Sequence, residues 1–335
     1  MMNEGVSHSR STIDAHIHIT PDKATMMLEI MNANGLGCVV NVGTLEVCNL
    51  PFGDGMRLFR SVLGNRMAYF PTPDFSDTAP GFGERMADEL ERKVQAGACG
   101  LKIFKELGLR HKDAEGKTIP VDDPRLDPLW ARAGVLSVPV LIHTADPLAH
   151  FQPLDKNNER FEQLQRHPDW HYPSPEFTDH DTLLDQRNHI IEYHPNTIFI
   201  GAHLGNYAEN LSYVDACLER YPNLYVDTSA RIGTFGQHPI KQVREFFLKH
   251  QDRIIFGSDL ILGWDAFADE EGDIAQYTHF YDTHWQFFET DKEQIEYPEF
   301  PLQGKQKVNA INLPGDVLDK IYTQNVQRLI PQFRG

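Results

Sequence analysis

The residues with the clearest capacity for chemistry are two histidines near the start of the sequence, in the stretch TIDAHIHI at residues 12–19. His16 and His18 interrupt an otherwise apolar run rich in isoleucine, which is typical of a buried β-strand. Side chains two residues apart in a strand point to the same face, so the two imidazoles would project together. With 16 histidines in 335 residues, about one His-x-His pair is expected by chance, so the pair needs support from elsewhere.

That support comes from polar residues at the ends of later apolar runs. His143 follows PVLI, His203 lies in TIFIGAHLG, Asp259 in RIIFGSDL and Lys102 in CGLKIF. Each has an ordinary explanation, such as a hydrogen-bonded core histidine or an aspartate that caps a helix. A lysine in an apolar strand is harder to explain, because an unpaired buried ammonium is very costly. Imidazoles and a carboxylate that converge on one point are satisfied when they hold a divalent metal ion.

The elements that must position these residues follow from apolar patterning. Eight short runs rich in Val, Ile and Phe and bounded by Gly, Pro or Asn predict buried strands. They cover residues 12–19, 38–44, 67–75, 99–104, 139–145, 197–205, 224–230 and 253–260. Between them, amphipathic stretches predict helices at 21–35, 82–97, 181–195, 211–222, 238–250 and 314–330. In the second of these, Met86, Leu90 and Val94 recur at helical spacing, and Gly97 ends the stretch.

Strands that alternate with helices predict parallel βαβ units, and eight such units predict an α/β protein of the (β/α)8 TIM-barrel type. The alternative is an open doubly wound sheet, but no glycine-rich phosphate loop follows the first strand. We expect residues 1–335 to form one domain. Three stretches after strands exceed an ordinary connection, at 105–123, 146–180 and 261–313. We interpret them as insertions at the C-terminal face of the strands that form pocket walls or a lid, with oligomer contacts as the alternative.

Composition excludes several classes of partner. The chain has 31 Lys and Arg against 48 Asp and Glu, a net charge of −17, which repels nucleic acids and anionic membranes. No run of 18 apolar residues occurs, and the first ten residues lack the apolar region of a secretion signal. The four cysteines form no Cys-x-x-Cys pair, which favours reduced thiols. We therefore expect a cytoplasmic protein that acts on a small molecule.

The stretches DAHIHI, GLKIF, LIHTAD, GAHLGN and FGSDL, in this order, resemble the amidohydrolase superfamily, specifically its amidohydrolase-related (amidohydrolase 2) branch. That branch includes aminocarboxymuconate-semialdehyde decarboxylase, γ-resorcylate decarboxylase and several lactone hydrolases. The resemblance spans nearly the whole chain and implies a site with one metal ion, preferably zinc, with manganese or another divalent ion as alternatives. It implies that the ligands are His16, His18, His143 and Asp259. Family analogy also suggests a homodimer.

The resemblance gives the remaining polar residues supporting roles. His203 would be an acid–base or substrate-orienting residue, although in some relatives the corresponding histidine is a ligand. Lys102 would remain a plain ammonium, whereas the equivalent lysine elsewhere in the superfamily is carbamylated and bridges two metals. Asp14 would orient a ligand or the neighbouring backbone.

The substrate is not fixed by these motifs. The decarboxylases of the branch carry Arg or aromatic residues on early loops that have no match in VGTLEVCNLPFGDG. Arg231 and Asp74 follow predicted strands, and Trp264 and His171 lie in the long stretches, so we expect them to line the pocket. Trp170 and Trp285 could add aromatic surface there. A role in packing or in a salt bridge is the alternative for each.

The expected chemistry is hydrolysis of a small amide, ester or lactone. A zinc-like ion lowers the pKa of its water from about 16 to about 7, and the activated water then attacks a carbonyl. Asp259 would move the proton, and Lys102 or His203 would stabilise the developing negative charge. A metal-dependent decarboxylase of an aromatic or muconate-like acid is the alternative function. A barrel that only binds a ligand is a third.

Overall fold

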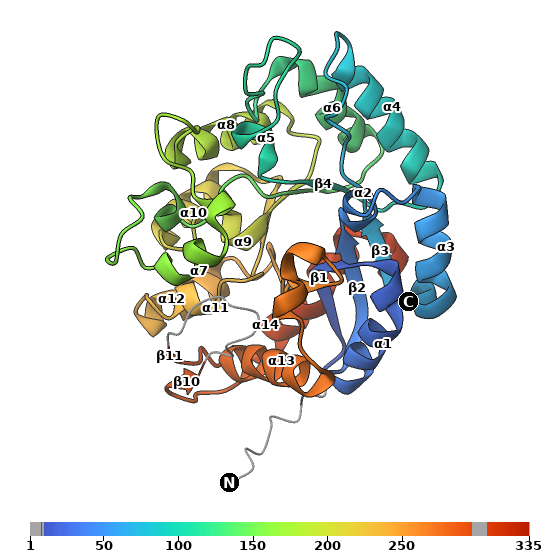
Figure 1. Ribbon diagram of the computed structural model, residues 1–335. Coiled ribbons are helices and arrows are strands. Elements are labelled where there is room, and N and C mark those ends of the chain that lie inside the picture. Colours follow the sequence, from blue (N-terminus) through green and yellow to red (C-terminus); the bar gives the residue numbers. More distant parts are fainter. Residues whose placement is uncertain (1–7, 9, 297–306, 335) are drawn as a thin grey trace. The chain divides into compact units, whose positions relative to one another are not determined.

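The computed structural model describes residue 8 and residues 10–296 and 307–334 (Figure 1). The chain divides into two compact units, which we describe separately. The first unit comprises the residues up to Tyr69 and those from Asp227 onward, and the second comprises Phe70–Val226. In the described ranges, no helix combines the length and the apolar composition that crossing a bilayer requires. Our expectation of a single domain stays a prediction.

The first unit is organised around its first strand. Its strands are β1 (Thr12–Ile19), β2 (Leu36–Val42), β3 (Met67–Phe70, whose last residue begins the second unit), β8 (Ile254–Ile255), β9 (Leu260–Leu262) and the short antiparallel pair β10 (Ile295–Glu296) and β11 (Lys307–Val308). Four of them form a sheet in the order β3-β2-β1-β9, and β1 is parallel to both of its neighbours. All eight residues of β1 are buried, which explains why this strand is apolar without alternation.

Helices follow these strands in the first unit. They are α1 (Ala24–Ala33), α2 (Thr44–Val47), α3 (Phe52–Leu63), α11 (Ile232–Phe235), α12 (Ile240–Lys249), α13 (Ile274–Glu289), α14 (Gly315–Asp319) and α15 (Asn325–Leu329). Helices α1 and α13 pack against each other beside β1 (Figure 1). The residue before α13, Asp273, forms a capping box with Gln276. Because α13 lies within the stretch 261–313 and buries aromatic residues, part of that stretch belongs to the core of this unit.

The second unit repeats the βα pattern. Its strands β4 (Leu101–Ile103), β5 (Val140–Ile142), β6 (Phe199–Gly201) and β7 (Leu224–Asp227) lie side by side and parallel in that order, and the last residue of β7, Asp227, belongs to the first unit. Its helices include α4 (Phe82–Gln95), α5 (Glu106–Leu109), α6 (Asp127–Val135), α7 (Phe161–Arg166), α8 (His180–Tyr193), α9 (Ala202–Gly205) and α10 (Leu211–Arg220). In α4, Met86 and Leu90 are buried, as their helical spacing predicts.

The last predicted strand differs from the expectation. The sequence predicts one strand over 253–260, but the structure has β8 and β9 with a break between them. A Cβ on Gly257 would lie 2.9 Å from the Cβ of His16, so this segment passes β1 too closely for a side chain. Asp259 then has a φ of 66°, in the left-handed region, and its N–H donates to the His16 carbonyl at 2.8 Å. The break therefore brings Asp259 beside β1.

Candidate metal centre

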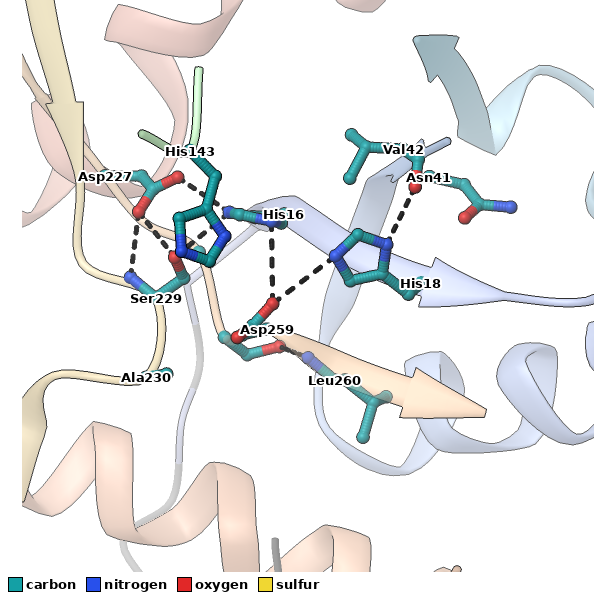
Figure 2. Close-up of polar contacts among 12 residues, drawn as sticks. His16, His18, Asn41, Val42, His143, Asp227, Ser229, Ala230, Asp259 and Leu260 are labelled. Atoms are coloured by element: carbon teal, nitrogen blue, oxygen red, sulfur yellow. Dashed lines mark hydrogen bonds and ion pairs between the residues drawn. The ribbon is translucent and has the colours of Figure 1, made fainter. Parts of the chain in front are cut away.

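Three predicted ligands meet in the first unit. The Nε2 atoms of His16 and His18 each lie 3.5 Å from Oδ1 of Asp259 (Figure 2). One donor atom from each residue falls within 4.8 Å of the other two. Two donors that are each about 2.1 Å from a zinc ion at a tetrahedral angle are separated by about 3.4 Å, whereas a charge-assisted hydrogen bond measures about 2.7–2.9 Å. The spacing therefore fits a shared cation better than direct hydrogen bonds.

Both imidazoles are oriented from their other ring nitrogen. Nδ1 of His16 lies 2.8 Å from Oδ2 of Asp227, and Nδ1 of His18 lies 2.7 Å from the carbonyl oxygen of Val42, the last residue of β2 (Figure 2). A neutral imidazole that donates from Nδ1 has its lone pair on Nε2. Each ring thus presents a metal-binding nitrogen toward Asp259 without any rearrangement.

Asp14 holds the backbone on either side of this cluster. Its Oδ1 accepts hydrogen bonds from the N–H groups of Ser258 at 3.0 Å and His16 at 3.2 Å, and its Oδ2 accepts from the Tyr281 hydroxyl at 2.7 Å. Burial raises the pKa of Asp14 to about 6, although these hydrogen bonds favour the charged form. Asp14 thus ties β1 to the residue before Asp259, so it contacts neighbouring backbone as we expected.

The two predicted substrate-binding residues of the first unit have different surroundings. The ring of Trp264 lies 4.7 Å from the ring of His18, centroid to centroid, so it borders the ligand cluster. Arg231 is buried, and its Nη1 donates to the carbonyl of Ala230 at 2.8 Å. Contact with substrate stays a prediction for both.

In the second unit the structure brings His143 and His203 together. Their rings are 4.4 Å apart in an edge-to-face arrangement, and Nε2 of His143 lies 3.1 Å from Oδ1 of Asp146. Burial lowers the pKa of His143 to about 4, although Asp146 opposes this shift, so the ring is neutral at pH 7. Because Nε2 contacts Asp146, Nδ1 is the nitrogen with which His143 would bind a metal. The metal-binding role of His143 and the acid–base role of His203 stay predictions.

The other predicted residues of this unit are dispersed along it. Lys102 is fully buried on β4, with its Nζ 5.0 Å from the centre of the Phe104 ring. Asp74 is exposed and accepts a hydrogen bond from the backbone of Ser76 at 2.8 Å, which lowers its pKa. Nε2 of His171 lies 2.9 Å from the carbonyl oxygen of Gln152. Their functional roles also stay predictions.

Sequence reasoning missed three residues that contact the ligands or their supports, namely Asp227, Ser229 and Tyr281. Asp227 and Ser229 lie in LYVDTSA, and an acidic residue at the end of a buried strand was the available signal, as it was for Asp259. Trp285, considered for an aromatic pocket, is only 2% exposed and stacks on His8 at 4.0 Å, so it belongs to the core.

Known structures share this fold. An uncharacterised TIM-barrel protein from Bordetella bronchiseptica is 15% identical, with a TM-score of 0.55 over 97% of this chain and 99% of its own. The 5-carboxyvanillate decarboxylase from Sphingomonas paucimobilis is 13% identical, with a TM-score of 0.53 over 96% of this chain and 99% of its own. IDCase from Metarhizium anisopliae is 11% identical, with a TM-score of 0.54 over 97% of this chain and 98% of its own. These similarities confirm the predicted (β/α)8 TIM-barrel fold.

Sequence comparison places the chain more narrowly. A search of curated protein sequences found no match. The family model Amidohydro_2, described as amidohydrolase, matches residues 13–331, which include every residue of the cluster His16, His18 and Asp259. The resemblance inferred from the ordered motifs is thereby confirmed, and the chain belongs to the Amidohydro_2 amidohydrolase family.

Proposed function

We propose that this protein is a metal-dependent hydrolase of a small amide, ester or lactone. The observation that carries the proposal is the arrangement of His16 and His18, whose Nδ1 atoms are held by hydrogen bonds while both Nε2 atoms face Oδ1 of Asp259. Two imidazoles and a carboxylate suit zinc, with manganese or another divalent ion as alternatives. We include His143 as a fourth ligand, bound through Nδ1. Membership of the amidohydrolase family supports hydrolysis.

The chain's own residues divide the work of the reaction. A divalent ion bound here would polarise a substrate carbonyl and lower the pKa of water from about 16 to about 7. The Asp259 carboxylate would accept a proton from the attacking water and deliver it to the leaving group. His203 and Lys102 would stabilise negative charge that develops on the carbonyl oxygen. Trp264, beside His18, would cover one side of the reacting group and exclude bulk water from it.

The overall charge limits the partners of such an enzyme. With a net charge of −17, the protein is proposed to act on a small molecule in the cytoplasm, without nucleic acid or membrane partners. A homodimer is the proposed assembly. We assign the substrate-binding roles to Arg231, Asp74, Trp264 and His171.

The test is hydrolysis in isotopically labelled water. Protein loaded with one equivalent of zinc is incubated with a panel of amides, esters and lactones in H2(18O), and product mass is measured. We expect 18O in the carboxylate product, loss of turnover after chelation and recovery on adding zinc. Asp259→Asn should abolish turnover, while Asp181→Asn, which changes an exposed carboxylate of the second unit, serves as the comparison for general charge loss. Stoichiometric zinc without hydrolysis of any compound would contradict the proposal.

A decarboxylase is the second candidate, because one protein with the same fold is named 5-carboxyvanillate decarboxylase. A cation held by His16, His18 and Asp259 would supply electron-withdrawing charge for the loss of carbon dioxide, and His203, as the acid–base residue, would deliver the proton that replaces it on carbon. Aromatic and muconate-like acids carrying 13C in the carboxyl group distinguish the two functions. Release of 13CO2 without 18O in the remaining product would replace the hydrolase proposal with the lyase.

A further inference from the structure

We propose that Asp227, braced by Ser229, is a positioning residue that fixes the tautomer of His16 and strengthens its bond to the cation. The inference deepens the proposed function and rests on it. It concerns a carboxylate that none of the sequence motifs singles out and that does not itself belong to the cluster of ligand atoms.

The three residues form a closely connected group (Figure 2). Asp227 ends β7 and Ser229 follows two residues later, and His16, Asp227 and Ser229 are all fully buried. Oδ2 of Asp227 lies 2.8 Å from Nδ1 of His16. Oδ1 of Asp227 accepts hydrogen bonds from the Ser229 hydroxyl at 2.5 Å and from the Ser229 N–H at 3.1 Å. The carboxylate is therefore held in one orientation before any cation arrives.

This arrangement specifies the tautomer of His16. An ionised carboxylate only accepts hydrogen bonds, so Nδ1 of His16 must be the protonated nitrogen. The Ser229 hydroxyl lies 3.0 Å from the same Nδ1, but because its proton goes to Asp227 it is a second acceptor there rather than a competing donor. Nε2, at the opposite end of the ring, is then left with the lone pair that a metal requires.

The two histidines differ in the charge of their partners. His18 donates to a neutral carbonyl, that of Val42, whereas His16 donates to a carboxylate. Hydrogen bonds to charged acceptors are about twice as strong as neutral ones and increase the basicity of the imidazole. His16 is therefore the stronger of the two imidazole ligands, and Asp227 is the reason.

The experiment measures zinc affinity and the tautomer separately from turnover. Zinc alone is titrated in competition with a chromophoric chelator against the wild type and the variants Asp227→Ala, Asp227→Asn and Ser229→Ala. In parallel, 15N NMR of the metal-free, histidine-labelled protein reports which nitrogen of His16 carries the proton. Asp123→Asn is the control, because Asp123 is also a buried carboxylate but bonds to Arg125 in the second unit.

We expect Asp227→Ala to weaken zinc binding about 10- to 100-fold and to release His16 into a mixture of tautomers. In Asp227→Asn the amide oxygen would keep the two Ser229 donors and the NH2 group would face Nδ1 of His16, so the ring proton should move to Nε2 and zinc affinity should fall by about 10- to 100-fold. Ser229→Ala should have a smaller effect, and the control none. If Asp227→Ala fails to fold, the zinc affinities and His16 tautomers of Asp227→Asn and Ser229→Ala test the proposal instead.

Two failures remain distinguishable. Wild-type protein that binds no zinc at all would overturn the proposed function together with this inference. Wild-type protein that binds zinc, with folded Asp227 variants that keep wild-type affinity and the Nδ1-protonated tautomer of His16, would overturn the role of Asp227 alone. A merely structural contribution of Asp227 would lower stability without moving either the tautomer or the affinity.

Discussion

Removing the hydroxyl of Tyr281 should weaken both the fold and the candidate metal centre. Tyr281 lies on α13 and donates to Oδ2 of Asp14 at 2.7 Å. Burial raises the pKa of Tyr281 well above its usual value of 10, so the phenol keeps its proton and remains a donor. Asp14, with a pKa of about 6, is ionised at pH 8. The contact is therefore a hydrogen bond to a charged acceptor in a site from which water is excluded.

The magnitude follows from that geometry. A hydrogen bond to a charged group contributes about 1.5–3 kcal/mol, and the buried oxygen left behind by Tyr281→Phe has no solvent to replace the lost donor. We expect the free energy of unfolding at pH 8 to fall by about 2–3 kcal/mol. Because Asp14 also binds the N–H groups of His16 and Ser258, the same variant should bind zinc several-fold more weakly.

The assay is urea unfolding of metal-free protein, followed by zinc titration of the folded variant. Tyr277→Phe is the matched control on the same helix, since the Tyr277 hydroxyl is also buried but accepts from a neutral backbone group, the N–H of Gly272, at 3.0 Å. It should lose only about 1 kcal/mol and keep its zinc affinity. Equal losses of stability in the two variants, or an unchanged zinc affinity in Tyr281→Phe, would refute the reasoning.

Two further predictions concern charge in the core. Burial lowers the pKa of His284 from 6.5 to about 4, so on acidification the unfolded chain takes up this proton first. The contribution of neutral, buried His284 to the free energy of unfolding is fully present above pH 6.5. Below that pH the free energy of unfolding falls by about 1.4 kcal/mol per pH unit toward pH 4, a loss of about 3 kcal/mol in all. In urea titrations, His284→Leu should lose less stability between pH 7.5 and pH 4.5 than the wild type does. The exposed His189→Gln is the control, and the prediction fails if His284→Leu differs from the wild type no more than this control does. In the second unit, Lys105→Met leaves the buried Asp146 without its ion-pair partner at 2.5 Å and should cost about 3 kcal/mol in the same assay. Lys105→Arg should retain most of the stability, so equal losses in the two variants would argue against the pair.

Much of the candidate metal centre could be predicted from the sequence because the residue patterns that indicate it are local. A buried parallel strand is a short apolar run, and two histidines at a spacing of two within it must share a face. The sequence accordingly predicts β1 with its observed bounds, Thr12–Ile19, and the side-by-side placement of His16 and His18. The order of the strands also predicts that Asp259 lies near these two histidines, since parallel strands present their C-terminal ends at one edge.

Local patterns carry less information about α13. Its buried residues include polar side chains such as Thr283, His284 and Gln286, so no clean apolar stripe at helical spacing appears in the sequence. From its length and its position after a strand, we interpret the stretch 261–313 as pocket wall or lid, with oligomer contacts as the alternative, and this stays a prediction. Helix α13, which lies in this stretch, packs against α1 and supplies Tyr281 to Asp14, and these contacts depend on tertiary structure.

What the sequence determined by itself is the family, the residue types of the candidate site and the strands that deliver them. Only the tertiary structure decided the partners that orient those ligands, namely Asp227 for His16, the Val42 carbonyl for His18 and the break between β8 and β9 that turns Asp259 toward them. Asp227 is 211 residues from His16 along the chain. A hydrogen bond over that separation depends on how strands pack rather than on the neighbours of either residue, so no local pattern encodes it.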